Sequence, residues 1–517
     1  IWGEHGKGFR SEYNPLFFGE TLYGAICEIK GVFDPENRLN PGKLAVPPGK
    51  GDLFTIEADK RGKFDRQIGP DTRTKYSTSI NCNGNGQCFD VDVDSVMCPS
   101  SKVTRDRIHS PKGRAGVMRE WLRQLEVARP GQALALAAPS PAGFLTRAAN
   151  HRSGDYDFSH EVYRAMDGCL ACKACATQCP IQVDVPAFRS EFLARYHGRY
   201  LRPVSDHLIA GLENVLPWMA RLPRLVNLLS TNALSRWVLK RFGLVDIPAV
   251  STTSLDAALR NRGVARVDAN ALAAGGRVTG VSENGRPLVF LLDAFTTYYE
   301  PHIVLAAVEV AQRLGRDVRV LGFEPSGKGA HVKGFLGRFS AQAQRWKAIL
   351  AGLDGADVVG LDPAVVLVFR DELPHALGEA APTTVSLLQE WLEAAAFPAP
   401  VAKADGAYSL FAHCTERTAA PKTNALWKKI FSKAGLRLDV ESVGCCGMCG
   451  AFGHEARHEA ESRGIYDLSW RPHLAKVADR SEALATGYSC RSQVKRCEGR
   501  SLRHPIEVLA AHLRSVP

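Results

Sequence analysis

The sequence lacks any apolar run long enough to cross a membrane. Runs such as 287–295 and 364–369 have the length of strands, far short of the ~20 residues that a membrane helix needs. We therefore expect no membrane-spanning segment. The chain also lacks an initiator Met and a leader, because it opens Ile1-Trp2-Gly3. We interpret it as the inside of a longer protein, in which targeting signals are not judged from this end.

Motifs for nucleic-acid binding are missing as well. The 65 Lys and Arg against 54 Asp and Glu give a net charge of +11, which by itself could attract nucleic acid, anionic lipid or an acidic partner. No helix-turn-helix, C2H2 finger or RNA-binding signature accompanies this charge. We therefore predict a solvated basic surface and no nucleic-acid partner. The length of 517 residues predicts about three domains.

The sequence also lacks the pattern of a secreted, disulfide-bonded protein, because its 14 cysteines are clustered and not spread along the chain. Clustered thiols favour metal sites in a reducing compartment, which predicts a cytoplasmic protein. The densest cluster has the spacing C-x2-C-x2-C-x3-C, ends in Pro180 and consists of Cys169, Cys172, Cys175 and Cys179. It resembles the run that holds a four-iron, four-sulfur cluster in bacterial-type ferredoxins. The alternatives are a zinc knot, although zinc sites prefer two separated pairs, or buried thiols without metal.

A second, degenerate half of a two-cluster ferredoxin lies upstream. Cys82 and Cys88 occupy the first and third ligand positions, Asn85 stands where the second cysteine belongs, and Cys98 precedes a proline as a displaced fourth. The fourth cysteine of each half ligates the other cluster. We therefore expect Cys98 to join Cys169, Cys172 and Cys175. Cys179 would join Cys82 and Cys88 in a site with three thiolates, which suits a three-iron cluster or a four-iron cluster with a labile iron. The alternatives are that Asn85 or water fills the fourth place, or that this site is empty.

Helices are predicted around these cysteines. One begins after a Ser110 cap with Pro111 at its first position, and another opens at Asp184-Val185-Pro186. Residues 200–246 predict further helices with basic and apolar faces. We expect them to pack against the cluster domain, and the alternative is that they lie on a membrane surface.

The last third of the chain alternates strands and helices in two copies. Strands at 288–292 and 317–323 flank a helix at 301–314, and the same order recurs at 408–412, 421–434 and 436–443. A shift of 120 residues (288 to 408) aligns Asp293-Ala294 with His413-Cys414, and Pro325-Ser326-Gly327 with Cys445-Cys446-Gly447. An internal duplication explains this pattern.

Only the second copy carries thiols. Cys414, Cys445, Cys446 and Cys490 resemble the ligands of the CCG domain found in iron–sulfur subunits of heterodisulfide reductases and glycolate oxidases. That resemblance implies a further iron–sulfur cluster, with Cys449 as an additional candidate and Cys497 as a spare thiol. The family usually ends C-x-x-C, whereas residues 487–490 read Gly-Tyr-Ser-Cys, so the cluster type stays open. A thiol cluster without metal is the alternative, and the first copy is interpreted as structural.

Residues 1–47 contain Gly3-Glu4-His5-Gly6 and, after a helix predicted at 20–33, the tail Asp34-Pro35 to Lys43. Both segments resemble the C-terminal end of flavin-linked oxidases of the vanillyl-alcohol-oxidase type. The resemblance implies that Glu4 binds a divalent metal or orients substrate, that His5 is the active-site histidine and that Asn40 lies near the flavin. Lys7 and Arg10 are candidates to bind a substrate carboxylate. The family's flavin-binding half precedes this motif, so FAD would be held mainly by residues outside this chain.

The predicted fold class is α+β and multidomain. The expected parts are the end of a flavin-oxidase C-terminal domain (1–47), a linker (48–79), a mainly helical ferredoxin-like module (80–246), a second linker (247–285), a degenerate α/β CCG repeat (286–400) and a cysteine-bearing CCG repeat (401–517).

This order resembles the large FAD and iron–sulfur dehydrogenases of the bacterial D-2-hydroxyglutarate type. The resemblance implies oxidation of a D-2-hydroxy acid, with electrons leaving through the clusters to a quinone or an electron-transfer protein. It further implies a homo-oligomer in the cytoplasm, with peripheral membrane contact as an alternative location. The competing interpretation is an iron–sulfur subunit of a glycolate or D-lactate oxidase-type complex that relays electrons without substrate chemistry of its own.

Overall fold

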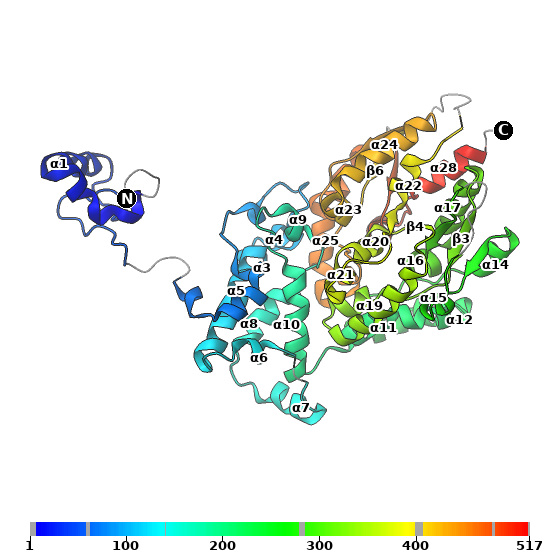
Figure 1. The fold of residues 1–517 in the computed structure, drawn as a ribbon, viewed down its shortest axis with the longest axis horizontal. Coiled ribbons are helices and arrows are strands. Elements are labelled where there is room, and N and C mark those ends of the chain that lie inside the picture. Colours follow the sequence, from blue (N-terminus) through cyan, green and yellow to red (C-terminus); the bar gives the residue numbers. More distant parts are fainter. Residues whose placement is uncertain are drawn as a thin grey trace. The chain divides into compact units, whose positions relative to one another are not determined.

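The structure is a computed structural model that describes residues 7–57, 63–139, 141–278, 285–398, 407–477 and 481–514. It divides into two compact units, Ile1–Ile68 and Gly69–Pro517, which are described separately (Figure 1). In the described residues no helix is both long enough and apolar enough to span a bilayer.

The first unit is a helix with a folded-back tail. Its elements are η1 (Lys7–Tyr13), α1 (Asn14–Phe33) and η2 (Phe64–Gln67). α1 breaks at Gly19, so its continuous part begins where the sequence predicts a helix. After α1, the Asp34 carboxylate accepts hydrogen bonds from the backbone N–H groups of Arg38 and Leu39 and pairs with Lys30 at 2.6 Å. These contacts hold the tail in a tight turn.

Helices make up the first part of the second unit. In chain order they are α2 (Pro70–Lys75), α3 (Ser77–Ile80), η3 (Gln87–Phe89), α4 (Pro99–Thr104), η4 (Arg107–His109), α5 (Pro111–Ala128), α6 (Ala133–Ala137), α7 (Phe144–Ser153), α8 (Ser159–Asp167), α9 (Ala174–Gln178), α10 (Val185–Arg199), α11 (Val204–Met219), α12 (Pro223–Ser230) and α13 (Ala233–Arg241). The two predicted caps are confirmed, since Ser110 accepts from the Gly113 N–H and Asp184 from the Ala187 N–H.

Parallel sheets and their covering helices form the rest. The elements are α14 (Leu255–Asn261), β1 (Ala265–Val267), α15 (Ala269–Ala273), β2 (Leu288–Leu291), α16 (Ala294–Tyr298), α17 (Pro301–Arg313), β3 (Val318–Leu321), α18 (Lys328–Val332), α19 (Leu336–Ala351), β4 (Asp357–Gly360), α20 (Pro363–Arg370), α21 (Glu372–Leu377), β5 (Ser386–Leu387), α22 (Leu388–Ala394), β6 (Ala407–Phe411), α23 (Cys414–Ala419), η5 (Pro421–Thr423), α24 (Asn424–Lys433), β7 (Arg437–Val440), η6 (Phe452–His454), η7 (Ala456–His458), α25 (Glu459–Leu468), α26 (Trp470–Val477), β8 (Glu482–Ala485), α27 (Tyr488–Glu498) and α28 (Pro505–Arg514).

The two sheets repeat one topology. In the described residues one sheet has the order β1-β3-β2-β4-β5 and the other β7-β6-β8, and all pairs are parallel. β3-β2-β4 therefore corresponds to β7-β6-β8. The register agrees too, because Leu288 faces Val318 while Tyr408 faces Leu438, at the same shift of 120 residues. We call the copy with β2, β3 and β4 the thiol-free copy, and the copy with β6, β7 and β8 the thiol copy.

Both copies bury side chains in one continuous apolar core. It contains residues of the thiol-free copy, such as Phe290 and Val308, together with Leu410, Trp427 and Leu509 of the thiol copy. The hydrophobic effect thereby fixes the two sheets against each other.

Three segments differ from the predictions. Residues 247–285, expected to be a linker, contribute β1 to the larger sheet and two short helices, α14 and α15. Residues 48–79 contain α2 and α3. The apolar run 364–369 has the length of a strand but forms α20, which begins at Pro363 and is capped by the Asp362 carboxylate. A short apolar run is compatible with a buried helix as well as a strand, and here the cap decides.

Candidate iron–sulfur sites

The predicted substrate residues belong to the first unit. Glu4 and His5 lie outside the described residues, and so does the side chain of Lys7. Arg10 is half-buried in η1. Asn40 is exposed in the turn after α1, where its φ is +48° and its carbonyl accepts from the Lys43 N–H. The structure therefore shows the backbone that carries Lys7, Arg10 and Asn40, and the Glu4–His5 motif stays a prediction.

In the second unit, the structure brings four thiols together around one cavity. Its lining includes Cys98, Cys169, Cys172 and Cys175. Cys98 comes from the start of α4, Cys169 and Cys172 from the loop before α9, and Cys175 from α9 itself. In that loop Ala171 and Lys173 adopt left-handed conformations, with φ of +56° and +62°. Such backbone forms concave nests of N–H groups that suit anionic groups, including iron–sulfur clusters.

Hydrogen-bond donors point at these sulfurs. The Ala171 N–H donates to Cys169 Sγ at 3.4 Å, and Arg114 Nη1 lies 3.7 Å from Cys98 Sγ. Arg114 is 1% exposed, and its guanidinium is held by the Ala165 carbonyl and the Ser100 hydroxyl. A fixed buried cation of this kind stabilises negative charge at the neighbouring thiol.

Burial opposes that charge when the thiols are alone. It raises the pKa values of Cys98, Cys172 and Cys175 above the ordinary value of a thiol. Iron supplies the positive charge that lets a buried cysteine bind as thiolate. Four thiols around one cavity, two sulfur-directed donors and left-handed backbone fit a four-iron cluster.

The degenerate half forms a second cavity of similar size. The empty space is about 290 Å³, against about 320 Å³ for the first cavity. Its lining includes Cys82, Cys88, Cys179 and Asn85. The Asn85 side-chain oxygen already accepts from the Gln87 N–H at 3.0 Å. The donor set therefore fits a cluster with three thiolates, and the cavity is only slightly smaller than the one with four thiols.

A third group of thiols lies at the carboxyl ends of β6, β7 and β8. Cys414 opens α23 directly after β6, Cys445 and Cys446 follow β7, and Cys490 lies in α27 after β8. The four are buried. Neighbouring thiols interact from Cys414 through Cys445 and Cys446 to Cys490. Ligand sites in parallel sheets gather at this edge because adjacent strands end there together.

Gly447 permits the turn that brings the vicinal cysteines into this group. Its φ is +85°, and a Cβ atom there would lie 2.1 Å from the backbone oxygen of Ser462. Only glycine fits both the conformation and the close approach.

Cys449 connects the third group with the first cavity. Its thiol donates to the Leu170 carbonyl, at 3.0 Å, in the loop that carries Cys169 and Cys172. Burial raises its pKa, as do the neighbouring thiols of Cys414 and Cys172. Sequence reasoning named Cys449 only as an additional candidate, since its contact spans 279 residues of chain. Cys497, the predicted spare thiol, is half-buried in α27.

In the described ranges no three His, Cys, Asp or Glu side chains are arranged to hold a metal ion. A cubane cluster needs cysteine sulfurs that lie farther apart than the ligands of a single metal ion, because each of its irons binds one cysteine and the sulfurs surround the cluster.

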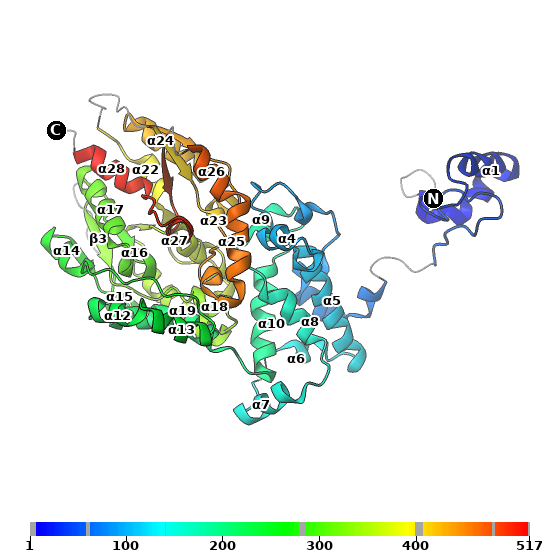
Figure 2. The same cartoon turned by 180° about the vertical axis from the view of Figure 1, so that it is seen from behind.

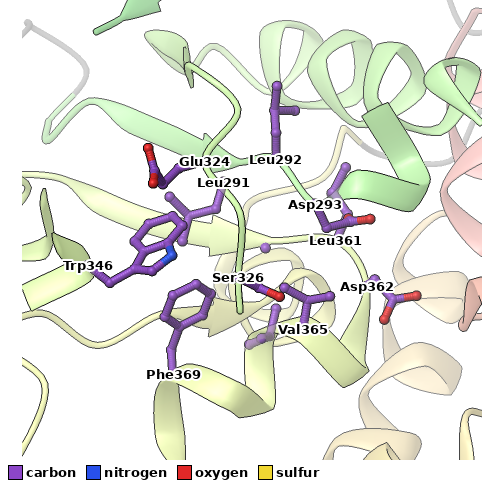
Figure 3. Close-up of a pocket in the computed structure, with 12 residues that line it drawn as sticks. Leu291, Leu292, Asp293, Glu324, Ser326, Trp346, Leu361, Asp362, Val365 and Phe369 are labelled. Carbon is purple, nitrogen blue, oxygen red and sulfur yellow. The ribbon is translucent and has the colours of Figure 1, made fainter. Parts of the chain in front are cut away.

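The thiol-free copy has a cavity at the corresponding edge of its own sheet. Asp293 after β2, Ser326 after β3 and Asp362 after β4 line it, together with apolar side chains (Figure 3). Burial, and then the neighbouring Asp362, raise the pKa of Asp293 to about 7. Of these residues, Ser326 stands where the thiol copy has Cys446, whereas Asp293 stands where it has His413.

Two parts of the chain match the models of known protein families. Residues 1–44 match the C-terminal domain of FAD-linked oxidases, and residues 78–183 match the 4Fe-4S dicluster domain. The chain thus carries the end of a flavin-oxidase domain and a two-cluster ferredoxin-like module, as the sequence predicts.

The curated relatives match nearly the whole chain and share one name. The chain is 46% identical over 523 residues to D-2-hydroxyglutarate dehydrogenase of Escherichia coli, covering 98% of this chain and 51% of the relative. It is 45% identical over 520 residues to the protein of that name in Pseudomonas putida and 42% identical over 537 residues to that of Haemophilus influenzae. These alignments cover 98% and 99% of this chain and 51% and 52% of the relatives. The chain therefore spans about half the length of the curated relatives it matches. No solved structure matches it significantly.

Proposed function

We propose that this chain is the iron–sulfur half of an FAD-dependent D-2-hydroxy acid dehydrogenase that converts D-2-hydroxyglutarate to 2-oxoglutarate. The observation that carries the proposal is the 46% identity, over 98% of the chain, to a protein of that name. The three thiol groups in the second unit supply what an electron-relaying half requires. The alternative, a relay subunit of a glycolate or D-lactate oxidase-type complex, has no use for the oxidase tail that residues 1–44 match.

We place the iron–sulfur clusters at the three groups of cysteines. We assign a four-iron cluster to Cys98, Cys169, Cys172 and Cys175, a second cluster of three or four irons to Cys82, Cys88 and Cys179, and a CCG-type cluster to Cys414, Cys445, Cys446 and Cys490. When bound, such clusters accept and pass on single electrons, which lets the two electrons of a flavin leave separately.

The chain's own residues prepare these positions. Arg114 and the Ala171 N–H direct positive charge at two of the sulfurs. Lys173, between Cys172 and Cys175, forms ion pairs with Asp184 and Asp371, both at 2.8 Å. The second of these pairs ties the cluster loop to α21 of the thiol-free copy. This anchoring keeps the left-handed loop in place when the charge of a cluster changes.

In the first unit, we assign substrate chemistry to the motif after Gly3. His5 takes the hydroxyl proton, Glu4 orients the substrate or holds a divalent metal, Lys7 and Arg10 bind its carboxylates, and Asn40 lies near the flavin. FAD would be held mainly by the half of the protein outside this chain. The acceptor is a quinone or an electron-transfer protein, and the protein is a cytoplasmic homo-oligomer.

The test uses the full-length protein. We expect bound FAD and dye reduction that depends on D-2-hydroxyglutarate, with kcat falling at least about 100-fold in His5→Ala because general-base assistance contributes that much. Unchanged turnover would remove His5 from the reaction. A protein without activity toward any D-2-hydroxy acid, but able to pass electrons from a separate dehydrogenase, would establish the relay alternative.

Iron and acid-labile sulfide, measured with low-temperature EPR, test the cluster assignment. The three-thiolate site predicts a three-iron signal that Cys82→Ser abolishes while the four-iron signal remains. About four irons per chain in total would leave a single cluster and show that both the Cys82 site and the CCG-type site are empty.

A further inference from the structure

Two short helices in the second unit present apolar side chains to solvent. α12 and α13 follow α11 and are separated only by Thr231 and Asn232, and we call this pair of helices the α12–α13 hairpin. In the described structure neither helix contains a buried residue. Figure 2 shows both helices along one edge of this unit. The expectation that residues 200–246 pack against the cluster domain therefore does not hold for the exposed apolar side chains of α12 and α13.

The exposed side chains are large and recur at helical spacing. Leu225 and Leu229 of α12 are four residues apart, and Leu234 and Trp237 of α13 are three residues apart. Trp218, Leu222 and Phe242 flank the two helices. Trp218, Leu229, Leu234 and Trp237 are each more than 60% exposed. Single exposed apolar residues are ordinary, whereas a contiguous patch of this kind marks a docking surface.

The charge of this surface has one sign. Between Glu213 and Asp246 the sequence has no Asp or Glu, and it has five basic residues, Arg221, Arg224, Arg236, Lys240 and Arg241. Among described residues none of the five forms an ion pair with an acidic side chain. The Arg221 guanidinium lies 4.0 Å from the centre of the Trp218 ring, which places a cation beside an amphipathic ring.

Hydrogen bonds and apolar packing hold the α12–α13 hairpin to the rest of the unit, while its exposed apolar side chains face solvent. Asn227 exchanges two hydrogen bonds, both 2.8 Å, with the backbone of Val250. Met219 and Val226 pack against a small core around Leu216. After α13, the Val245 N–H donates to the His454 carbonyl. The patch is thus held in one orientation by the rest of the fold.

We propose that the α12–α13 hairpin docks this protein on a membrane surface rich in anionic lipid. Tryptophan and leucine would enter the boundary between headgroups and acyl chains, and the five cations would meet the headgroup phosphates. A second copy fits less well, because a two-fold contact of the hairpin with itself would bring two sets of five cations together without an acid in either segment.

Sedimentation of the full-length protein with vesicles tests the proposal. We expect it to pellet with vesicles of phosphatidylcholine mixed with phosphatidylglycerol, to stay in solution with phosphatidylcholine alone, and to be released by high salt. The double variants Leu234→Gln with Trp237→Ser, and Arg236→Glu with Lys240→Glu, should each lower the partition coefficient at least about tenfold. Tryptophan emission should shift to shorter wavelength on binding, and less so in the Trp237 variant.

Matched controls separate docking from general stickiness. Phe144→Ser with Leu145→Gln removes two exposed apolar side chains of α7, 66% and 81% exposed, and should bind like the parent protein. Lys428→Glu removes an exposed cation of α24 and should also leave binding unchanged. Iron content and circular dichroism check that each variant is folded.

Two results would overturn the proposal. One is vesicle binding that is equal with and without anionic lipid and equal in the parent protein and the hairpin variants. The other is an absence of binding. In that case a fall in oligomer mass in the Trp237 variant would show that a second copy covers the patch, and an unchanged mass would assign it to another part of the protein.

Discussion

The two copies of the sheet differ in chemistry and agree in geometry. Asp293 and His413 occupy the same position, and both cap the next helix: the Asp293 carboxylate accepts from the Phe295 and Thr296 N–H groups, and His413 Nδ1 accepts from the Thr415 N–H. Ser326 corresponds to Cys446 and Gly327 to Gly447. The strand and turn framework therefore does not depend on the thiols, which are an addition to one copy.

The thiol-free copy supports the thiol copy directly. Its Asp362 carboxylate accepts from the Tyr488 N–H at the start of α27, the helix that carries Cys490. Its Glu300 pairs with the buried Arg491 of the same helix at 2.5 Å. Phe295 stacks on Tyr488 with ring centres 4.7 Å apart. A copy without ligands thus acts as a brace for a helix that bears one.

The largest difference between the copies is expected on removing sulfur. Cys446→Ser should lose the iron of the CCG-type site, because a buried hydroxyl does not replace a thiolate. Ser326→Ala, at the matching position, should keep all iron. It removes the hydrogen bond that the Ser326 hydroxyl donates to Glu213 at 2.7 Å and the one that it accepts from the Lys328 N–H, which should cost only about 1–2 kcal/mol of stability. Iron analysis and EPR of both variants make the measurement. Equal iron loss in the two would show that the copies share a cluster.

The second largest effect is expected from breaking the ion pair between Glu300 and Arg491. Arg491→Met leaves Glu300 without its partner and should cost about 3–5 kcal/mol of stability, because the pair is largely buried. Arg471→Ala removes half of an exposed pair with Asp467 and should cost under about 1 kcal/mol. Thermal unfolding followed by circular dichroism compares them. Equal small effects would mean that α27 is held by its apolar contacts alone.

The two turn glycines give a finer comparison. In Gly447→Ala the new methyl group meets a backbone oxygen at 2.1 Å, whereas in Gly327→Ala the nearest atom is a Phe339 ring carbon at 3.1 Å. Both positions have positive φ, which costs an alanine about 1–2 kcal/mol. We expect Gly447→Ala to add a clash and to disturb the EPR signal of the nearby cluster. Chemical denaturation and EPR report the two effects, and a milder phenotype for Gly447→Ala would contradict the structure.

The smallest expected effect is a pH dependence that arises from Asp293 of the thiol-free copy. Burial, and then Asp362, raise the pKa of Asp293 from 3.8 to about 7. The folded state therefore keeps a proton that the unfolded state releases, so stability falls as pH rises from about 4 to about 7.

Asp293→Asn removes this ionisation while keeping an oxygen for the helix cap. It should raise stability at pH 8 by about 1–3 kcal/mol and have little effect at pH 4. Unfolding midpoints of the parent protein and the variant, measured from pH 4 to pH 8, test this expectation. A gain that is equal at both pH values would show that Asp293 is protonated or ionised throughout. His413→Asn is the matched change in the thiol copy, where burial lowers the histidine pKa, and it should give no gain at pH 8.

Much of the fold was accessible from short stretches of sequence. Ser110 and Asp184 start helices as predicted, because a cap acts within three or four residues. The repeat of strand, helix and strand was visible as buried apolar runs at a fixed shift. The strand β1 was missed, since its three residues, Ala265–Val267, are too few for apolar alternation to indicate a strand, and they join the sheet only through pairing with β3.

The cysteine spacing by itself determined which thiols belong to a cluster-binding loop, because two-residue gaps act through local backbone geometry. It also predicted the grouping of Cys98 with Cys169, and the structure places both around one cavity. Only the tertiary structure decided that Cys449 donates to Leu170 and that Asp362 of one copy caps a helix of the other. It alone decided that α12 and α13 face solvent. Contacts of this kind join segments far apart in the chain, and they form only after packing of the apolar core has fixed the position of each segment.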